Sequence, residues 1–302
     1  MVEYMVIKIT EIILSPVLAL IIGIFFLGLF RKIMARIHWR YGPPILQPVI
    51  DIIKLFYQKS VSHGSMFNSG IIISVAGSII LVLFIPFGNM CPLGTSGGLL
   101  VILYLMLFAP LGIALSGGEG ANPNISIGIS RKFILSLGYE VPFLLVLLTV
   151  MTHYKTISII EVVTIQQNTG WALLSWPLFL PGIAYFLILP AMLGLRPFEI
   201  VSAPQEISSG PNAEYGGKYL ALVTIEHAFH LFIGIALFVN LFLGGAGNPV
   251  IFFIKMLVVF VLGVFIHAVF PRLRIEQAVA YLWKWPTILA FIGLILTILM
   301  KE

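Results

Sequence analysis

Eight long apolar stretches follow one another along the chain, and each approaches the length that a helix needs to cross a bilayer. About 20 mostly apolar residues span the hydrocarbon core. The pattern predicts transmembrane helices at about residues 9–30, 69–87, 98–116, 133–152, 172–194, 219–243, 249–270 and 286–300. The last stretch is short, and Trp283 and Trp285 before it are typical of interfacial anchors. The chain is therefore predicted to form a single all-α membrane domain over residues 1–302.

The segment between the first two predicted spans is too polar to cross a membrane. Within residues 45–58, apolar side chains recur at helical spacing, while Asp51, Lys54 and Gln58 fall largely on another side. A Gly-Pro-Pro turn at residues 42–44 precedes this segment. The pattern predicts an amphipathic helix at the membrane interface, which could serve as nothing more than a surface anchor.

Composition supports a polytopic membrane protein. Hydrophobic residues make up 60% of the chain, charged residues make up 10%, and the mean hydropathy is +1.08. Soluble domains contain about 25% charged residues. The one cysteine, Cys91, permits neither a disulfide within the chain nor a cysteine-ligated cluster, so any redox centre is expected in a partner.

The basic residues between the predicted spans indicate the orientation of the bundle. Thirteen lie in the loops that follow spans 1, 3, 5 and 7: Arg31, Lys32, Arg36, Arg40, Lys54, Lys59, Arg131, Lys132, Arg196, Lys218, Arg272, Arg274 and Lys284. The other side has three, Lys8, Lys155 and Lys301. Under the positive-inside rule, this asymmetry places both termini outside and the odd-numbered loops in the cytoplasm. Topology therefore explains the net charge of +5, and no nucleic-acid partner is expected.

One polar loop, residues 196–218, carries an unusual share of the acidic side chains. It holds Glu199, Glu206 and Glu214 between Arg196 and Lys218, although the whole chain has only twelve acidic residues. The positive-inside count places this loop on the cytoplasmic side. We expect it to be a polar contact and proton-handling surface.

Two further glutamates fall well inside predicted spans, Glu140 in the fourth and Glu226 in the sixth, whereas Glu11 lies near the end of the first. A charged side chain at the bilayer centre costs about 2.5–3.5 kcal/mol on insertion scales, so such residues usually have a function. Pro142 lacks a backbone donor and is expected to open the helix near Glu140. His230 shares a helix face with Glu226, which predicts a proton-handling pair. Metal ligation with His227, or simple packing between helices, is also possible.

Other chemistries are poorly supported. The glycine-rich residues 115–120 lack the Lys-Ser or Lys-Thr ending of a phosphate-binding loop. The order Glu-His-x-x-His at residues 226–230 differs from that of zinc proteases. A membrane serine protease using Ser209, or a stand-alone secondary transporter, remains as an alternative, although no internal repeat is evident.

Taken together, the motifs resemble those of the membrane subunit shared by respiratory complex I (its first, or H, subunit) and the energy-converting membrane-bound [NiFe] hydrogenases. Nearly the whole chain takes part in the resemblance. The matching stretches are Arg40-Tyr41-Gly42-Pro43 with Leu46-Gln47-Pro48, Tyr139-Glu140-Val141-Pro142, Arg196-Pro197-Phe198-Glu199, Gln205-Glu206-Ile207 and Glu214-Tyr215-Gly216-Gly217.

The resemblance implies a membrane subunit that anchors the peripheral arm and links its redox chemistry to antiporter-like subunits. By motif it implies proton or ion coupling through Glu140, Glu199, Glu206 and Glu214. Glu226 with its helix neighbour His230, and Glu119, are further candidates for this coupling. The residues expected to dock the arm are Arg36, Arg40, Asp51, Lys54, Arg196 and Lys218. The resemblance also implies peripheral large and small subunits and a ferredoxin-like iron–sulfur subunit. The [NiFe] centre and the clusters are expected in those partners, and no cofactor or metal is expected in this chain.

The loop sequence favours one branch of this family. Leu195-Arg196-Pro197-Phe198-Glu199 lacks the Asn-Arg-Ala-Pro-Phe-Asp run of complex I members, and Pro211 follows Gly210 where they have Phe. The loop is closer to that of ferredoxin-dependent hydrogenases and sulfur-reducing relatives. The alternative is the quinone-binding H subunit of an NADH, ferredoxin or F420 dehydrogenase.

Overall fold

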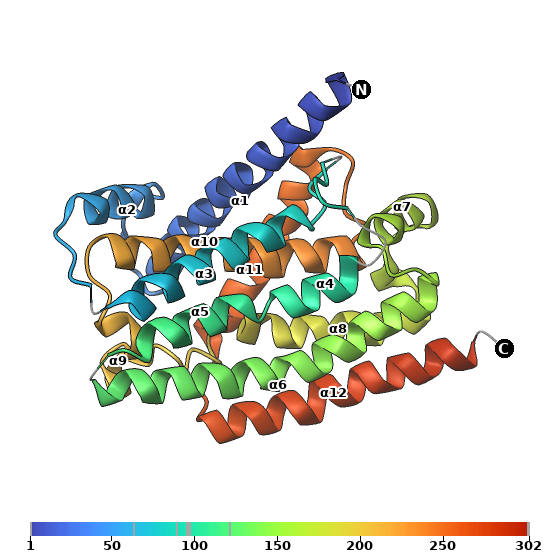
Figure 1. Ribbon diagram of the computed structural model, residues 1–302. Helices are drawn as coiled ribbons and strands as arrows, with labels where there is room; N and C mark the ends of the chain where they lie inside the picture. Colours follow the sequence, from blue (N-terminus) through green and yellow to red (C-terminus); the bar gives the residue numbers. More distant parts are fainter. Residues whose placement is uncertain (1, 63, 89, 95–97, 121, 301–302) are drawn as a thin grey trace.

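The computed structural model describes residues 2–62, 64–88, 90–94, 98–120 and 122–300, and helices make up nearly all of their regular structure. The long helices run roughly side by side (Figure 1). The α-helices are α1 (Val2–Ile37), α2 (Gln47–Tyr57), α3 (Ser65–Leu83), α4 (Gly98–Leu105), α5 (Phe108–Gly117), α6 (Pro123–Tyr154), α7 (Ile159–Thr169), α8 (Trp176–Met192), α9 (Pro204–Ile207), α10 (Lys218–Phe242), α11 (Pro249–Val269) and α12 (Ile275–Leu299). Two 3₁₀ helices, η1 (Ala172–Leu174) and η2 (Gly210–Ala213), complete the set.

The prediction of an all-helical integral membrane protein is confirmed. Within the described residues, seven segments are long and apolar enough to cross a membrane: α1, α3, α4 with α5, α6, α10, α11 and α12. The helix at the remaining predicted position, α8, is also apolar but has 17 residues. The predicted amphipathic helix at 45–58 is present as α2.

Helix α10 forms the centre of the bundle, and its second half is buried on every side. Residues 231–242 are all buried, as expected for a helix that is apolar all round. It contacts α1, α2, α3, α8 and α11. Stacked rings of Phe26 and Phe260, with centroids 4.5 Å apart, join α1 to α11 beside it.

Helices α3 and α5 approach each other closely because small residues face one another. A Cβ on Gly70 would lie 2.5 Å from the Gly112 carbonyl oxygen, and one on Gly112 would lie 2.5 Å from the Gly70 oxygen. Close contact between small residues is a common basis of helix association in membranes. This contact places the end of α5 beside the start of α3.

The span predicted at 98–116 is interrupted, because α4 ends at Leu105 and α5 starts at Phe108. Pro110 explains the break. It has no N–H to donate to the Met106 carbonyl, and its ring would clash with that carbonyl in a continuous helix. By contrast, α6 continues through Pro142, so any opening there is local to the carbonyl of Gly138, which loses its usual donor.

Two predicted spans begin much earlier than the hydropathy pattern indicated. α6 begins at Pro123, where the Asn122 side chain caps it by accepting a hydrogen bond from the Asn124 N–H (3.0 Å). α12 begins at Ile275 and continues through Pro286. The carbonyl of Leu282, which loses its usual donor to Pro286, accepts a hydrogen bond from the Thr287 hydroxyl instead (3.0 Å). Lys132 and Lys284, predicted to lie in loops, are therefore helical.

The two ends of the bundle differ in character. α2 and α9 lie at one end, whereas the start of α1 and the last turn of α12 lie at the other (Figure 1). The structure thus brings the basic, loop-rich segments together at the end that carries α2 and α9. We call this the α2/α9 end.

Candidate functional site

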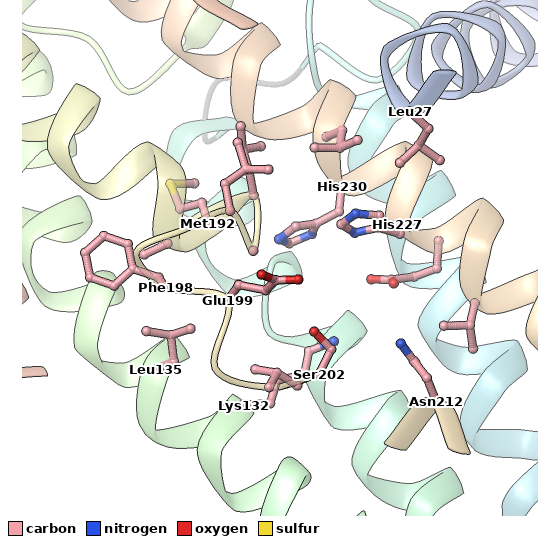
Figure 2. Close-up of a pocket in the computed structure, with 18 of the residues that line it drawn as sticks. Leu27, Lys132, Leu135, Met192, Phe198, Glu199, Ser202, Asn212, His227 and His230 are labelled. Atoms are coloured by element: carbon pink, nitrogen blue, oxygen red, sulfur yellow. The ribbon is translucent and has the colours of Figure 1, made fainter. Parts of the chain in front are cut away.

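A cavity of about 370 Å³ opens inside the bundle toward the α2/α9 end. Its walls come from α1, α5, α6, α10 and α11 and from the segment between α8 and α10. Most of the lining is apolar. Several polar side chains nevertheless face the same space, and Figure 2 shows Glu199, His227 and His230 converging on it.

Helix α10 supplies one polar wall. Glu226, His227 and His230 all line the cavity, and their spacing of one to four residues places them within about one helical turn. Glu226 is 5% exposed, whereas His227 is exposed to the cavity. His230 lies against the backbone of Met192 at the end of α8. The predicted pairing of Glu226 with His230 on one face is thus consistent with the structure, although no hydrogen bond joins them within the described residues.

Helix α6 supplies a basic side chain, Lys132, to the cavity lining. Lys132 and Tyr139 are seven residues apart, and both line the cavity. Lys132 interacts electrostatically with Glu226 and with both imidazoles. Among the residues that the structure describes, it forms no hydrogen bond or ion pair. The Lys132 amine and the Glu226 carboxyl group therefore line the same cavity without direct contact.

Glu199 lies at the α2/α9 side of the cavity, where two arginines hold it. Its carboxylate accepts hydrogen bonds from Arg196 Nε (3.0 Å) and Arg272 Nη2 (3.3 Å). The backbone N–H of Arg196 donates to His267 Nδ1 (2.9 Å), and the ring of His267 packs edge-on against Phe30. This cluster ties the polar loop to α1 and α11.

The loop between α8 and α10 turns sharply around short helices. Ser208 and Ser209 have positive φ angles of 49° and 73°, and Gly210 follows at 54°. Gly128 of α6 packs directly against Pro211, because a Cβ there would lie 2.5 Å from the proline ring. These contacts fold the loop back onto α6 as one side of the cavity.

The remaining predicted coupling carboxylates lie outside the cavity lining. Glu206 pairs with Arg131 (2.9 Å) and is 53% exposed. Glu119 accepts a hydrogen bond from the Phe67 N–H (2.6 Å), so it caps the start of α3. Glu214 lies beside Gly120. Glu140 is half-buried, whereas its neighbour Tyr139 faces the cavity.

The residues predicted to dock a peripheral arm are spread over the α2/α9 end. Four of them are exposed: Arg36, Arg40, Lys54 and Lys218. Arg36 lies over the ring of Tyr41, and Lys218 lies over the ring of Tyr219. Arg196 donates a hydrogen bond to Glu199. Asp51 accepts hydrogen bonds from Gln47 and Arg31, both at 2.8 Å. These bonds hold the pKa of Asp51 below its ordinary value. Asp51 therefore fixes α2 to α1.

Lys132 and His267 were not predicted as site residues, whereas His227 was considered only as a metal ligand and Tyr139 only as part of a matching motif. Lys132 was assigned to a loop because residues 123–132 are less apolar than the span that follows. The Asn122-Pro123 pair was the available signal, since Asn at the N-cap and Pro at the first helical position mark a helix start. His267 gave no local signal. Within the described residues, no group of three or more His, Cys, Asp or Glu side chains is arranged to hold a metal ion.

Comparison with known families decides the assignment. The family model described as NADH dehydrogenase matches residues 9–298. This chain belongs to the complex I subunit 1/H family. Curated members of the family are similar over most of their length. NADH-ubiquinone oxidoreductase chain 1 of Metridium senile is 28% identical, covering 95% of this chain and 92% of that protein. The H subunit of NADH-quinone oxidoreductase from Protochlamydia amoebophila is 29% identical, covering 88% and 89%.

Two further relatives come from other kinds of complex. The H subunit of F(420)H(2) dehydrogenase from Methanosarcina mazei is 28% identical, covering 87% of this chain and 86% of that protein. A chain in the structure of the membrane-bound sulfane sulfur reductase, an archaeal respiratory membrane complex, is 38% identical. It superposes with a TM-score of 0.92 and covers 96% of this chain and 99% of its own length. The subunit 1/H chain described here is thus a multi-pass membrane subunit of a complex I-like respiratory complex.

Proposed function

We propose that this subunit anchors the peripheral arm of a ferredoxin-dependent membrane-bound hydrogenase or sulfane reductase and couples its electron transfer to H⁺ or Na⁺ transport. The choice of this branch of the family rests on the 38% identity to the sulfane sulfur reductase chain. The relatives from NADH and F420H2 dehydrogenases are 27–29% identical. The form of the loop at Gly210-Pro211 agrees with this choice. The partners would be hydrogenase-like large and small subunits, a ferredoxin-like subunit and antiporter-like subunits. The [NiFe] centre and iron–sulfur clusters would reside in those partners.

The proposed topology has eight spans in the cytoplasmic membrane, with both termini outside. Helix α8 would be the eighth span. Its 17 residues would extend about 26 Å, close to the thickness of the hydrocarbon core of about 30 Å. The start of α1 and the end of α12 lie at the same end of the bundle, as an even number of spans requires (Figure 1). The polar loop would then face the cytoplasm.

The chain's own residues would move charge between the polar loop and the bundle interior. Glu199, held by Arg196 and Arg272, would sense events at the docked arm, because these three side chains form an ion-pair cluster beside the cavity. Glu226 would take up or release a proton deeper inside, where Lys132 and the imidazoles surround it. Glu140 would continue the relay toward the antiporter-like subunits.

The alternative function, that of a quinone-binding H subunit, also has support. Small-molecule sites usually have volumes of about 300–1,000 Å³ and mostly apolar walls, and this cavity is within that range. A soluble quinone analogue would distinguish the two functions. Electron transfer that depends on added quinone would favour the alternative, whereas hydrogen or sulfide production from reduced ferredoxin without quinone would favour the proposal.

Replacing Glu140 or Glu226 with Gln tests the coupling role. In the complete complex reconstituted into liposomes, each change should abolish the ion gradient while ferredoxin-driven electron transfer remains measurable, because Gln keeps the shape but cannot ionise. The gradient would be followed with a pH- or Na⁺-sensitive dye, and electron transfer by product formation.

Glu276→Gln is the matched control, because Glu276 is an exposed acid in the first turn of α12. It should leave both measurements unchanged. Intact ion transport in the Glu226 and Glu140 variants would eliminate the relay.

A further inference from the structure

Two buried hydroxyl groups, those of Ser116 and Tyr215, lack hydrogen-bond partners among the described residues. Ser116 is 0% exposed and Tyr215 is 4% exposed. They come from different parts of the chain, the end of α5 and the loop before α10. The two hydroxyls interact with each other, without the geometry of a good hydrogen bond. Buried polar groups are nearly always well paired, and these two hydroxyls have only this contact with each other among the described residues.

Both residues are close in the chain to acidic residues outside the cavity lining. Tyr215 directly follows Glu214, whose side chain lies beside Gly120, and Ser116 precedes Glu119 by three residues. Tyr215 also interacts electrostatically with Glu226, which lines the cavity. The pair thus has acidic neighbours in the loop segments and a further one, Glu226, in the bundle.

An aromatic cluster separates this hydroxyl pair from its surroundings. The ring of Phe67 packs against Tyr215, with centroids 5.5 Å apart, and edge-on against Tyr219 at 5.0 Å. Phe67 is itself held by Glu119, which accepts a hydrogen bond from its backbone N–H. Phe67, Tyr215 and Tyr219 are all buried, so the cluster shields the hydroxyl pair from bulk solvent.

We propose that Ser116 and Tyr215 form a hydroxyl bridge that passes protons between the Glu214 side of the polar loop and Glu226 in the cavity, with bound water completing the chain. The inference rests on the proposed coupling function and adds an entry route to it. Burial, reinforced by the nearby Glu226, raises the pKa of Tyr215, so this hydroxyl stays protonated. Each oxygen therefore accepts a proton on a lone pair while its own O–H proton passes to the next acceptor. Neither side chain carries a lasting charge.

Tyr215→Phe removes the hydroxyl and leaves the ring. The Tyr215 hydroxyl makes no hydrogen bond that holds another element in place, so it adds little to the stability of the complex. Its removal should leave the melting temperature of the complex unchanged or raise it. A bridging hydroxyl predicts that ion transport falls by about tenfold or more, since positioned proton-transfer groups contribute roughly 10²–10⁴-fold. Electron transfer should persist. Ser116→Ala should likewise lower ion transport without lowering the melting temperature.

Tyr185→Phe and Ser74→Ala are the matched controls. The Tyr185 hydroxyl donates to the Gly234 carbonyl (3.0 Å) and the Ser74 hydroxyl to the Ala109 carbonyl (3.1 Å), so both serve structure. Each control should lower the melting temperature and leave the number of ions moved per electron unchanged.

Full ion transport in both Tyr215→Phe and Ser116→Ala, together with loss of transport in Glu226→Gln, would overturn the bridge and leave the coupling function intact. Transport that survives Glu226→Gln would instead remove the function on which the bridge rests.

Discussion

At the scale of single residues, the cavity brings together a basic and an acidic side chain that do not touch. Lys132 of α6 and Glu226 of α10 both line it and interact electrostatically. An uncompensated charge inside a protein is costly, so each of the two stabilises the other even across an intervening space. No ion pair joins them among the described residues, so neither side chain is held by the other in a closed salt bridge.

A double-mutant cycle tests this pairing. Lys132→Met and Glu226→Gln should each destabilise the protein, and the double variant should be less destabilised than the sum, by roughly 0.5–3 kcal/mol. Thermal or denaturant unfolding of the purified complex would measure it. Combining Glu226→Gln with Lys284→Met, a cation on α12 outside the cavity lining, provides the control, in which the effects should add. Additivity in the Lys132 cycle would show that the two charges are independent.

At the scale of elements, the C-terminus of α10 is held by two side chains from neighbouring helices. Gln166 of α7 donates to the carbonyls of Asn240 (3.1 Å) and Leu241 (3.0 Å). Lys255 of α11 donates to the carbonyls of Leu243 and Gly245, both at 2.6 Å. The last carbonyls of a helix have no partner within it, so these contacts satisfy groups that would otherwise be buried unpaired.

Gln166→Leu should therefore destabilise the protein by about 2 kcal/mol or more, because each buried carbonyl left without a partner costs about 1–3 kcal/mol. The midpoint of thermal unfolding of the purified complex would measure the change. Gln167→Leu is the matched control, since Gln167 is the exposed neighbour on the same helix, and it should have almost no effect. Equal midpoints for the two variants would show that Gln166 does not hold α10.

At the scale of the whole molecule, the proposed topology gives the two ends of the bundle different accessibility. Asn168 of α7 and Lys59, two residues after α2, are both exposed. Helix α7 lies at the opposite end of the bundle from α2 (Figure 1). Cys91, the one native cysteine, is poorly reactive, because burial raises the pKa of its thiol to about 11. Labelling of cysteines introduced at positions 59 and 168 can therefore be measured with little contribution from Cys91.

In intact cells or right-side-out vesicles, a membrane-impermeant maleimide at pH 7 should label Asn168→Cys and leave Lys59→Cys unlabelled. Inverted vesicles should give the opposite pattern, and the native chain should stay unlabelled in both. Labelling of Lys59→Cys from outside would reverse the orientation.

Much of the bundle could be predicted from the sequence, because hydropathy depends only on local composition. Transfer of about 20 apolar residues into lipid is favourable wherever they lie in the chain, so the class, the approximate spans and α2 were recognisable. The starts of α6 and α12 were missed because a helix can extend beyond the lipid, where hydropathy gives no signal. In α12 the Thr287 hydroxyl also accommodates Pro286, and hydropathy does not register that hydrogen bond.

By itself, the sequence determined that the chain crosses a membrane, which family its motifs resemble and where its rare carboxylates lie along the chain. Only the tertiary structure decided which of them meet. It placed Glu226 in a cavity with Lys132, tied Glu199 to Arg196 and Arg272, and gave Glu119 a helix to cap. Most of these pairings join residues far apart in the chain, and they depend on which face each helix turns inward. That choice is made by packing against other helices, and no local pattern of residues contains it.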